Sequence, residues 1–160
     1  MDGTLRTARL LLVPADPEEL RMKYDGPDGA PAELSPKWIE KLRVARAPDP
    51  WEFGYFVLLA ESRETIGRVS FKGAPGPDGV VEIAYGIDEV FRRRGYATES
   101  AGALVAFAFA DSRVRLVCAH TLPGAAESGR VLAKCGFTRV GDVVDPEDGL
   151  VWRFEKARPR

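Results

Sequence analysis

The sequence predicts a mixed α/β fold in which a central, mostly antiparallel sheet of about seven strands packs against four helices. Seven short runs rich in aromatic and β-branched residues alternate with four stretches of helical periodicity. Three of these runs follow one another with only short turns between them, which favours antiparallel pairing. The stretch 80–121 reads as strand, helix and strand, long enough for a right-handed parallel crossover. The expected strands are 7–13, 53–61, 65–73, 80–88, 114–121, 137–144 and 150–155, and the expected helices are 16–24, 35–47, 98–112 and 125–135.

The first part of the chain reads as strand, helix and helix. The apolar run 7–13 is closed by Pro14, which ends the first strand. Each of the next two helices begins at a residue suited to capping, Asp16 or Ser35, and each cap is followed by proline. Between these helices, glycine or proline occupies nearly every second position of 25–34, so this segment is expected to be a loop.

The rest of the chain supplies the sheet and the helices that cover it. A polar connection at 62–64 joins two β-rich runs into a hairpin, and a turn rich in glycine and proline leads to the next run. The helix that follows has apolar residues at the spacing of one face laid on a sheet. Gly136 is placed to close the last helix, before a final hairpin. The apolar face comprises Ala101, Leu104, Val105, Ala108 and Phe109.

Composition and charge exclude several classes of partner. The 23 basic and 24 acidic side chains almost cancel, so no overall field would draw the protein to nucleic acid or to an anionic membrane. The composition is that of one ordinary globular domain spanning residues 1–160. The apolar run near the N-terminus is too short for a signal peptide or a membrane span. We therefore expect a cytoplasmic protein without a nucleic-acid or membrane partner.

Cys118 and Cys135 are the only cysteines, and His120 is the only histidine. Two cysteines are too few for a disulfide-stapled fold, and these three residues lack the spacing of a metal site. Each cysteine has apolar neighbours in the sequence, which predicts inert core thiols in a reducing compartment. No metal is expected.

Residues 90–100, VFRRRGYATES, place three arginines and a glycine in front of an apolar helix. The start of a helix already presents free N–H groups and partial positive charge. Added arginines there favour a bound anion such as phosphate, and Gly95 lets the backbone approach it closely. The alternative interpretation is a solvated basic loop. Neither G-x-G-x-x-G after a strand nor G-x-x-x-x-G-K-[ST] occurs, which argues against dinucleotide-oxidoreductase and P-loop functions.

The segment RRRGYATES resembles the R-x-x-G-x-A pyrophosphate loop of the GNAT superfamily of acetyl-CoA-dependent N-acetyltransferases, with Arg92, Gly95 and Ala97 on the motif positions. The stretch VEIAYGIDEVFRRRGYATES looks like that superfamily's fourth strand and third helix. The stretch AHTLPGAAESGRVLAKCGFTRVG looks like its fifth strand, fourth helix and G-F turn. The element order expected above also agrees with the superfamily's order. The Y-A-T-E and T-L-P sequences resemble the branch of ribosomal-protein alanine N-acetyltransferases.

This resemblance implies that acetyl-CoA binds where the fourth and fifth strands of the sheet splay apart. The backbone of Tyr85, Gly86 and Ile87 would pair with the pantetheine arm. Ser128 matches the serine at the family's helix entrance and would lie near the thiol end. The residues implied to surround the pyrophosphate are Arg92, Arg93, Arg94, Gly95, Tyr96, Ala97 and Thr98.

Acetyl transfer to an amine needs a base for the amine, donors for the developing oxyanion and a proton for the departing thiolate. Glu82 shares a strand face with Ala84 and Gly86. It is a candidate base, directly or through water, and the alternative is a salt-bridged strand glutamate. His120 is a candidate for proton transfer or a structural residue. Ser128 is the remaining local donor or a helix cap.

Two positions depart from the family pattern. The asparagine expected before the last helix is Ala125, and the tyrosine that many members use as general acid is Leu132. The identities of the acid and the base are therefore open. The rival hypothesis is a non-catalytic acyl-CoA-binding or sensor module of the same fold.

The acceptor is the least visible part of the hypothesis. A protein N-terminus, an amino-acid derivative and an aminated small molecule are all open, and so is an acyl group longer than acetyl. Superfamily members are often dimers, so a homodimer is an expectation from the resemblance alone. Three tryptophans, Trp38, Trp51 and Trp152, either line a pocket or belong to the core. Acidic residues that would suit a cationic amine, or simply serve turns, are Glu18, Glu19, Glu33, Asp145, Glu147 and Asp148.

Overall fold

Eight strands and five α-helices form in the residues that the computed structural model describes, 3–24, 35–146 and 148–160. The strands are β1 Leu5–Arg6, β2 Leu10–Pro14, β3 Tyr55–Leu59, β4 Thr65–Phe71, β5 Val80–Ile87, β6 Leu116–Thr121, β7 Thr138–Asp145 and β8 Gly149–Ala157. The helices are α1 Pro17–Tyr24, α2 Pro36–Val44, α3 Pro50–Phe53, α4 Tyr96–Ala110 and α5 Ala126–Lys134, with a 3₁₀ turn η1 at Glu89–Phe91.

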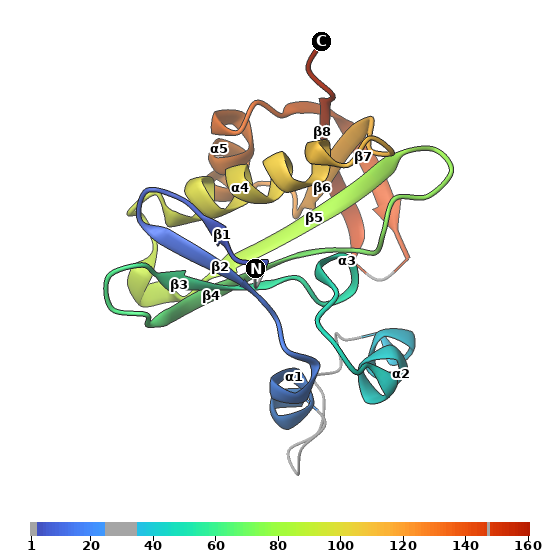
Figure 1. The fold of residues 1–160 in the computed structure, drawn as a ribbon. Coiled ribbons are helices and arrows are strands. Elements are labelled where there is room, and N and C mark those ends of the chain that lie inside the picture. Colours follow the sequence, from blue (N-terminus) through green and yellow to red (C-terminus); the bar gives the residue numbers. More distant parts are fainter. Residues whose placement is uncertain (1–2, 25–34, 147) are drawn as a thin grey trace.

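All strands belong to one sheet with the order β1-β2-β3-β4-β5-β6-β8-β7 (Figure 1). Every neighbouring pair is antiparallel except β5 and β6, which are parallel and joined through α4. The predicted fold class, with one parallel pair in a mostly antiparallel sheet, is therefore confirmed.

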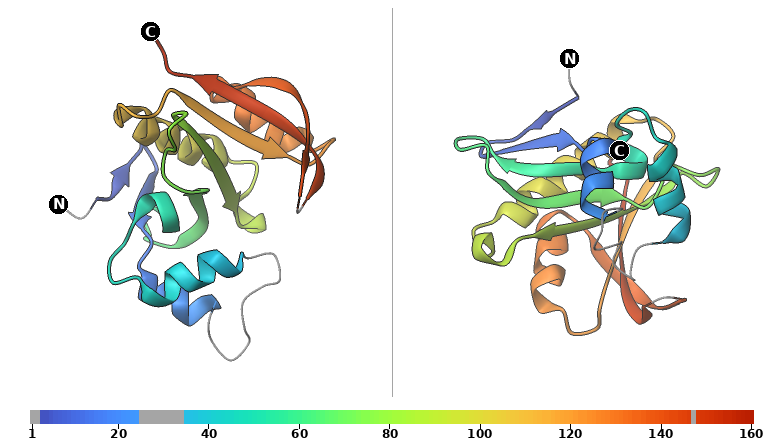
Figure 2. Two further views of the ribbon diagram at one scale, coloured as in Figure 1. Left: turned by 90° about the vertical axis from the view of Figure 1, so that its right-hand side faces the viewer. Right: turned by 90° about the horizontal axis from the view of Figure 1, so that it is seen from below.

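Helices cover both faces of the sheet. Helices α4 and α5 lie on one face, and α1 and α2 lie on the other (Figures 1 and 2). The face of α4 predicted to be apolar is buried at Ala101, Leu104, Val105 and Ala108, and Phe109 is partly buried. A smaller apolar cluster of Ala15, Leu20, Leu42 and Phe53 holds α1 and α2 against the chain beside β3.

Several observed elements differ from the prediction. The expected first strand at 7–13 contains a reversal, with the Thr7 N–H bonded to the Leu10 carbonyl at 3.0 Å, so that β1 and β2 form a hairpin. Helix α3 is additional, and its N-cap Asp49 accepts a hydrogen bond from the Trp51 N–H. Helix α4 begins two residues earlier than expected. Ser35 occupies the N-cap of α2, but its side chain makes no capping bond.

Further expectations concern the ends of helices, a membrane span and a loop. Asp16 caps α1 as predicted, since its carboxylate accepts from the Glu18 N–H at 2.9 Å. Gly136 follows α5 with a φ of 90°, the left-handed conformation expected of a closing glycine. None of the helices in the described segments has the length and apolar character required to cross a bilayer. The loop predicted at 25–34 lies outside the described residues.

Candidate active site

Strands β5 and β6 separate after only three residue pairs. Their pairing runs from Val80 with Leu116 to Glu82 with Cys118. Beyond Glu82, β5 pairs with β4 while β6 pairs with β8, so the two strands diverge toward their carboxyl ends (Figure 2, left). A cavity of about 470 Å³, here called the first cavity, opens at this divergence, within the size range of ligand sites. Its lining comprises Tyr85, Gly86, Ile87, Phe91, Arg92, Arg93, Gly95, Tyr96, Ala97, Thr98, Glu127, Ser128, Arg130, Val131 and Lys134.

The structure brings nearly all the residues predicted to bind the cofactor to this first cavity. The exception is Arg94, which is absent from the described lining. Its guanidinium lies 5.9 Å from the centre of the Phe91 ring, and its carbonyl accepts a hydrogen bond from Arg9 at 2.9 Å. Of the three consecutive arginines, Arg92 and Arg93 therefore face the cavity, and Arg94 contributes a backbone contact to the loop.

The loop before α4 has a backbone shaped by two residues with positive φ. Gly95 is the N-cap of α4 with φ 84°, and Arg93 has φ 65°. A non-glycine residue in this conformation is uncommon, and such strain is concentrated at functional sites. Gly95 provides no side-chain cap, so the first N–H groups of α4 are available to an anion at the cavity wall.

A second set of contacts fixes this loop to the start of the sheet. The Glu99 carboxylate accepts hydrogen bonds from the Arg9 side chain and backbone, each at 2.8 Å, and from the Thr7 hydroxyl. Arg9 also lies over the Tyr96 ring, 4.4 Å from its centre. Burial raises the pKa of Glu99, but the hydrogen bonds from Thr7 and Arg9 outweigh it and hold the pKa below its ordinary value. This contact was not predicted, because it joins residues about ninety positions apart.

Helix α5 adds cationic residues that the sequence analysis missed. Arg130 and Lys134 both line the first cavity, and their spacing of four residues places them on one helix face. Arg92 approaches from the opposite wall and donates from Nε to the Ile87 carbonyl at 2.9 Å. The basic i, i+4 spacing in α5 was visible in the sequence and could have indicated a wall of an anion site.

A hydrogen bond joins β5 to α5 at the first cavity. The Tyr85 hydroxyl donates to the Ser128 carbonyl at 3.2 Å. Burial raises the pKa of Tyr85 to about 12, against a smaller lowering by this hydrogen bond, so the phenol keeps its proton near neutrality. Ser128 is not the N-cap of α5, because the helix begins at Ala126 and Ala125 is the cap residue. The alternative role of Ser128 as a helix cap is therefore wrong.

Gly86 connects the first cavity with another on the opposite side of β5. This second cavity, of about 580 Å³, shares Tyr85, Gly86, Ile87 and Arg92 with the first. A Cβ on Gly86 would meet no atom within 4 Å, so this position of β5 borders open space. The other residues lining the second cavity are Lys23, Tyr24, Phe56, Thr65, Gly67, Arg68, Ser70, Ala84, Asp88 and Glu89.

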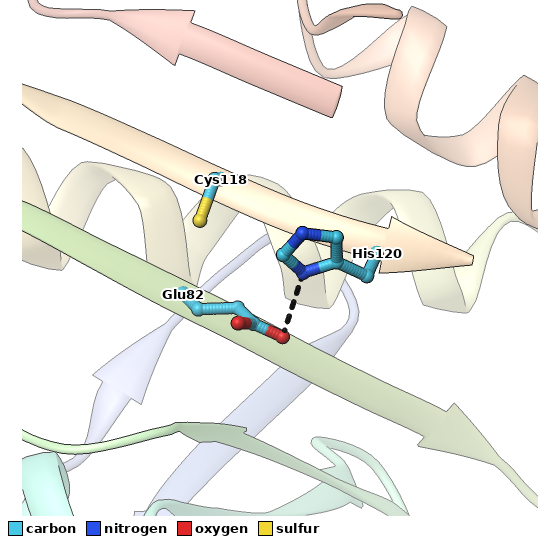
Figure 3. A group of neighbouring side chains, drawn as sticks. All are labelled: Glu82, Cys118 and His120. Atoms are coloured by element: carbon cyan, nitrogen blue, oxygen red, sulfur yellow. Dashed lines mark ion pairs between the residues drawn. The ribbon is translucent and has the colours of Figure 1, made fainter. Parts of the chain in front are cut away.

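Glu82 and His120 lie side by side on β5 and β6 (Figure 3). The His120 Nδ1 is 3.1 Å from a Glu82 carboxylate oxygen, but the geometry does not satisfy a hydrogen bond, and this buried nitrogen has no hydrogen-bond partner among the described residues. Glu82 also forms an ion pair of 3.0 Å with Lys72. Neither Glu82 nor His120 is among the described residues lining the two cavities. Of the three predicted catalytic residues, only Ser128 reaches the first cavity.

The surroundings of this pair perturb two neighbouring groups. Burial lowers the pKa of Lys72, but the hydrogen bond and charge of Glu82 outweigh it and raise the pKa overall. Burial raises the pKa of the Cys118 thiol to about 11. Cys118 is 2% exposed, in agreement with the expectation of a buried core thiol.

The remaining candidates for the acceptor side are placed as follows. Trp38 donates to the Glu52 carbonyl at 2.8 Å, Trp51 packs against Phe71 with the rings tilted by 45°, and Trp152 lies beneath Arg139. None of these tryptophans is among the described lining of either cavity, which supports their role in packing. Glu18, Glu19, Asp145 and Asp148 are also absent from that described lining, and Glu33 and Glu147 lie outside the described residues.

The two departures from the resembled pattern have different environments. Leu132 is fully buried in the main core, so a general acid at this position would not fit without repacking. Ala125 precedes α5 and offers no side-chain cap.

Comparison with known proteins identifies related sequences and folds. The family model described as the acetyltransferase (GNAT) domain matches residues 7–138. The uncharacterized N-acetyltransferase YjdG of Bacillus subtilis (strain 168) is 30% identical over 86 residues, which are 52% of this chain and 49% of that protein. The chain thus matches about half the length of this curated relative.

Solved structures share the fold. An aminoglycoside acetyltransferase AAC(6')-Ib in complex with coenzyme A and kanamycin has a TM-score of 0.58 and 25% identity, over 65% of each chain. The ribosomal-protein-S5-alanine acetyltransferase from Vibrio fischeri has a TM-score of 0.69 over 98% of this chain and 97% of that one. At 15% identity, the second likeness concerns the fold alone.

Proposed function

The chain belongs to the acetyltransferase (GNAT) family, and from this premise we propose that it transfers the acetyl group of acetyl-CoA to a primary amine, which attacks the thioester directly. Acetyl-CoA is the acyl donor of this family. The observation that carries the proposal for this chain is the meeting of two cavities at Gly86. One cavity ends at a helix start suited to phosphates, and the other opens on the opposite side of the strand.

The residues of the first cavity fit coenzyme A. The first N–H groups of α4, approached closely at Gly95, suit the pyrophosphate, and Arg92 and Arg93 add charge beside them. Beyond Glu82, the edge of β5 that faces β6 has no strand partner in the described chain. Its backbone groups at 85–87 are therefore available to the amides of an extended pantetheine arm. When bound, acetyl-CoA supplies an acetyl thioester activated toward an amine.

Glu82 and His120 are proposed to take up the proton of the acceptor amine. By strand alternation, Glu82 shares a face with Ala84 and Gly86, which line the second cavity. Glu82 is four residues from Gly86, about 13 Å along a strand, so proton transfer to this pair would pass through water.

The departing coenzyme A thiolate needs a proton donor in the first cavity. Ser128 and Tyr85 both line the first cavity, and both carry hydroxyl groups. Burial raises the pKa of Tyr85 to about 12, so its phenol is protonated near neutrality but is the weaker acid for it. These two groups are proposed to replace the acid that Leu132 cannot provide.

The acceptor is proposed to be a protein N-terminus or a small-molecule amine. The solved structures include enzymes named for both kinds of substrate, an aminoglycoside acetyltransferase and a ribosomal-protein acetyltransferase. The second cavity presents both acidic side chains, Asp88 and Glu89, and basic ones, Lys23 and Arg68. An amine that also carries an anionic group would match this mixture. Cytoplasmic location and homodimer formation stay predictions from the sequence.

The test is amine-dependent release of the coenzyme A thiol by the purified chain, with acetyl-CoA affinity measured in parallel. Glu82→Gln should lower kcat by about tenfold or more, because a general base contributes at least that much, and should leave acetyl-CoA affinity within about twofold. Glu61→Gln, at an exposed glutamate of the β3–β4 turn, is the matched control.

The outcomes separate the hypotheses. Normal turnover by Glu82→Gln would remove Glu82 as a base. Binding of acetyl-CoA without turnover on a panel of amines and peptide N-termini would favour the non-catalytic acyl-CoA-binding module instead.

A further inference from the structure

We propose that Glu82, Cys118 and His120 form a binding site for a thiophilic divalent cation, with Zn²⁺ as the best match. Their ligand atoms, one from each side chain, all lie within 4.8 Å of one another. Glu82 comes from β5, and Cys118 and His120 come from alternate positions of β6, so all three project from the same face of the sheet (Figure 3).

The donor set matches the preferences of zinc. Zinc binds thiolate, imidazole and carboxylate ligands at about 2.0–2.3 Å in a tetrahedral arrangement, so its ligand atoms lie about 3.3–3.7 Å apart. The observed group needs to contract by about 1.5 Å at most, through rotations of the side chains. Hard cations such as Mg²⁺ and Ca²⁺ prefer all-oxygen sites, whereas a thiolate selects for zinc and similar metals. The fourth position would be held by water.

The His120 ring gives independent support for this site. Its Nδ1 is buried and makes no hydrogen bond to a described residue, although a carboxylate oxygen lies 3.1 Å away. Leaving a buried polar atom without a partner destabilises the folded protein. A metal ion placed between the imidazole and the carboxylate would give this nitrogen a partner and satisfy the carboxylate at the same time.

The neighbouring charges allow a cation, although they do not attract one strongly. The Lys72 ammonium, 3.0 Å from Glu82, would have to move away, and its side chain is 53% exposed and free to do so. Arg153 lies close enough to Cys118 to affect its ionisation, but Arg153 is itself paired with Glu155 at 2.7 Å. As the Zn–S bond forms, the S–H bond breaks and the thiol proton passes to water. Metal coordination deprotonates a thiol that would otherwise stay neutral.

Occupation of this site would have a consequence for catalysis, which rests on the proposed function. A bound Zn²⁺ would hold the Glu82 carboxylate and the His120 imidazole, the two groups proposed to accept the amine's proton. Zinc should therefore inhibit acetyl transfer. The sequence alone predicts no metal here, because the spacing of Cys118 and His120 is not that of a zinc motif. The third ligand, Glu82, comes from another strand.

The test uses the full-length chain without acetyl-CoA and with Co²⁺ as a spectroscopic substitute for Zn²⁺. One Co²⁺ per chain should produce the near-ultraviolet charge-transfer band of a thiolate–cobalt bond, and Zn²⁺ should displace it. Cys118→Ser should abolish the band and weaken Zn²⁺ binding by about tenfold or more, since the loss of an outer-shell partner alone costs about 10–100-fold. Cys135→Ser, at the chain's other free cysteine, is the matched control and should keep both the band and the affinity.

The proposal is overturned if the band is absent from the wild-type chain, or if it persists in Cys118→Ser and disappears in Cys135→Ser. His120→Asn provides a second variant: it should weaken Zn²⁺ binding while circular dichroism shows an unchanged fold, and unchanged affinity would contradict the ligand set. Failure of the proposed function is distinguishable. If the chain binds Co²⁺ through Cys118 but does not acetylate amines, the metal site stands and the catalytic proposal falls.

Discussion

Replacing Gly86 with leucine should abolish acetyl-CoA binding without destabilising the protein. The Gly86 backbone does not have a positive φ, and a Cβ there would meet no atom within 4 Å, so the new side chain enters open space at a residue that lines both cavities. Glycine in a strand is less favourable than alanine by about 0.5–1 kcal/mol, so the variant alone should unfold about 1–4 °C higher than the wild type.

The stabilisation of the protein by acetyl-CoA should be smaller in this variant than in the wild type. Acetyl-CoA at 100 times its Kd stabilises a native protein by about 2.7 kcal/mol, which corresponds to about 5–11 °C for a chain of this size. If leucine weakens binding a hundredfold, the same concentration gives only about 0.4 kcal/mol, or about 1 °C. Thermal unfolding followed by circular dichroism measures both quantities.

Gly102→Leu is the matched control, because Gly102 lies on α4 and a Cβ there also meets nothing within 4 Å. This control should retain the full shift with acetyl-CoA. A full shift in Gly86→Leu would refute the placement of the pantetheine arm at β5.

Three further predictions test the loop and the core. Glu99→Gln should cost about 1–2 kcal/mol at neutral pH through weaker bonds to Arg9 and Thr7. The folded-state pKa of Glu99 is lowered, so the difference in unfolding free energy between wild type and variant should be fully present above the ordinary carboxyl pKa of about 4.3. Urea titrations should show that this difference disappears as pH falls through the pKa of Glu99 in the folded protein. A difference in unfolding free energy that does not depend on pH would contradict the assignment. Gly95→Ala should lose about 1–2 kcal/mol, since φ is 84°, and should also weaken acetyl-CoA binding in calorimetry; equal affinity would argue against the helix-start anion site. Leu132→Ala should cost about 2–5 kcal/mol in chemical unfolding, as expected for a fully buried leucine, and a loss below 1 kcal/mol would mean that this position is not core.

Local patterns predicted most of the secondary structure, and long-range contacts account for the main errors. The apolar face of α4 followed from helical spacing, and the cap of α1 followed from Asp16 before Pro17. The reversal between β1 and β2 could not be predicted from a local pattern, because Glu99 of the distant helix α4 holds Thr7 and Arg9. A hydrogen bond of this kind has no signal in the local sequence.

In the candidate site, too, local patterns could be predicted from the sequence and contacts between strands could not. The motif around Gly95 correctly indicated a helix start. The pairing of the backbone at Gly86 with a pantetheine arm stays a prediction. The group of Glu82, Cys118 and His120 was missed because alternation gives the face of each strand but not the register between two strands. That register places Glu82 opposite Cys118.

The central claim is that acetyl-CoA occupies the cavity between β5, the start of α4 and α5. The most direct measurement is two-dimensional NMR of the isotope-labelled chain during titration with acetyl-CoA. We predict saturable changes concentrated at the backbone amides of 85–87, 95–98 and 127–134, the segments that line this cavity. Absence of saturable changes, or changes confined to segments outside this cavity, would contradict the account.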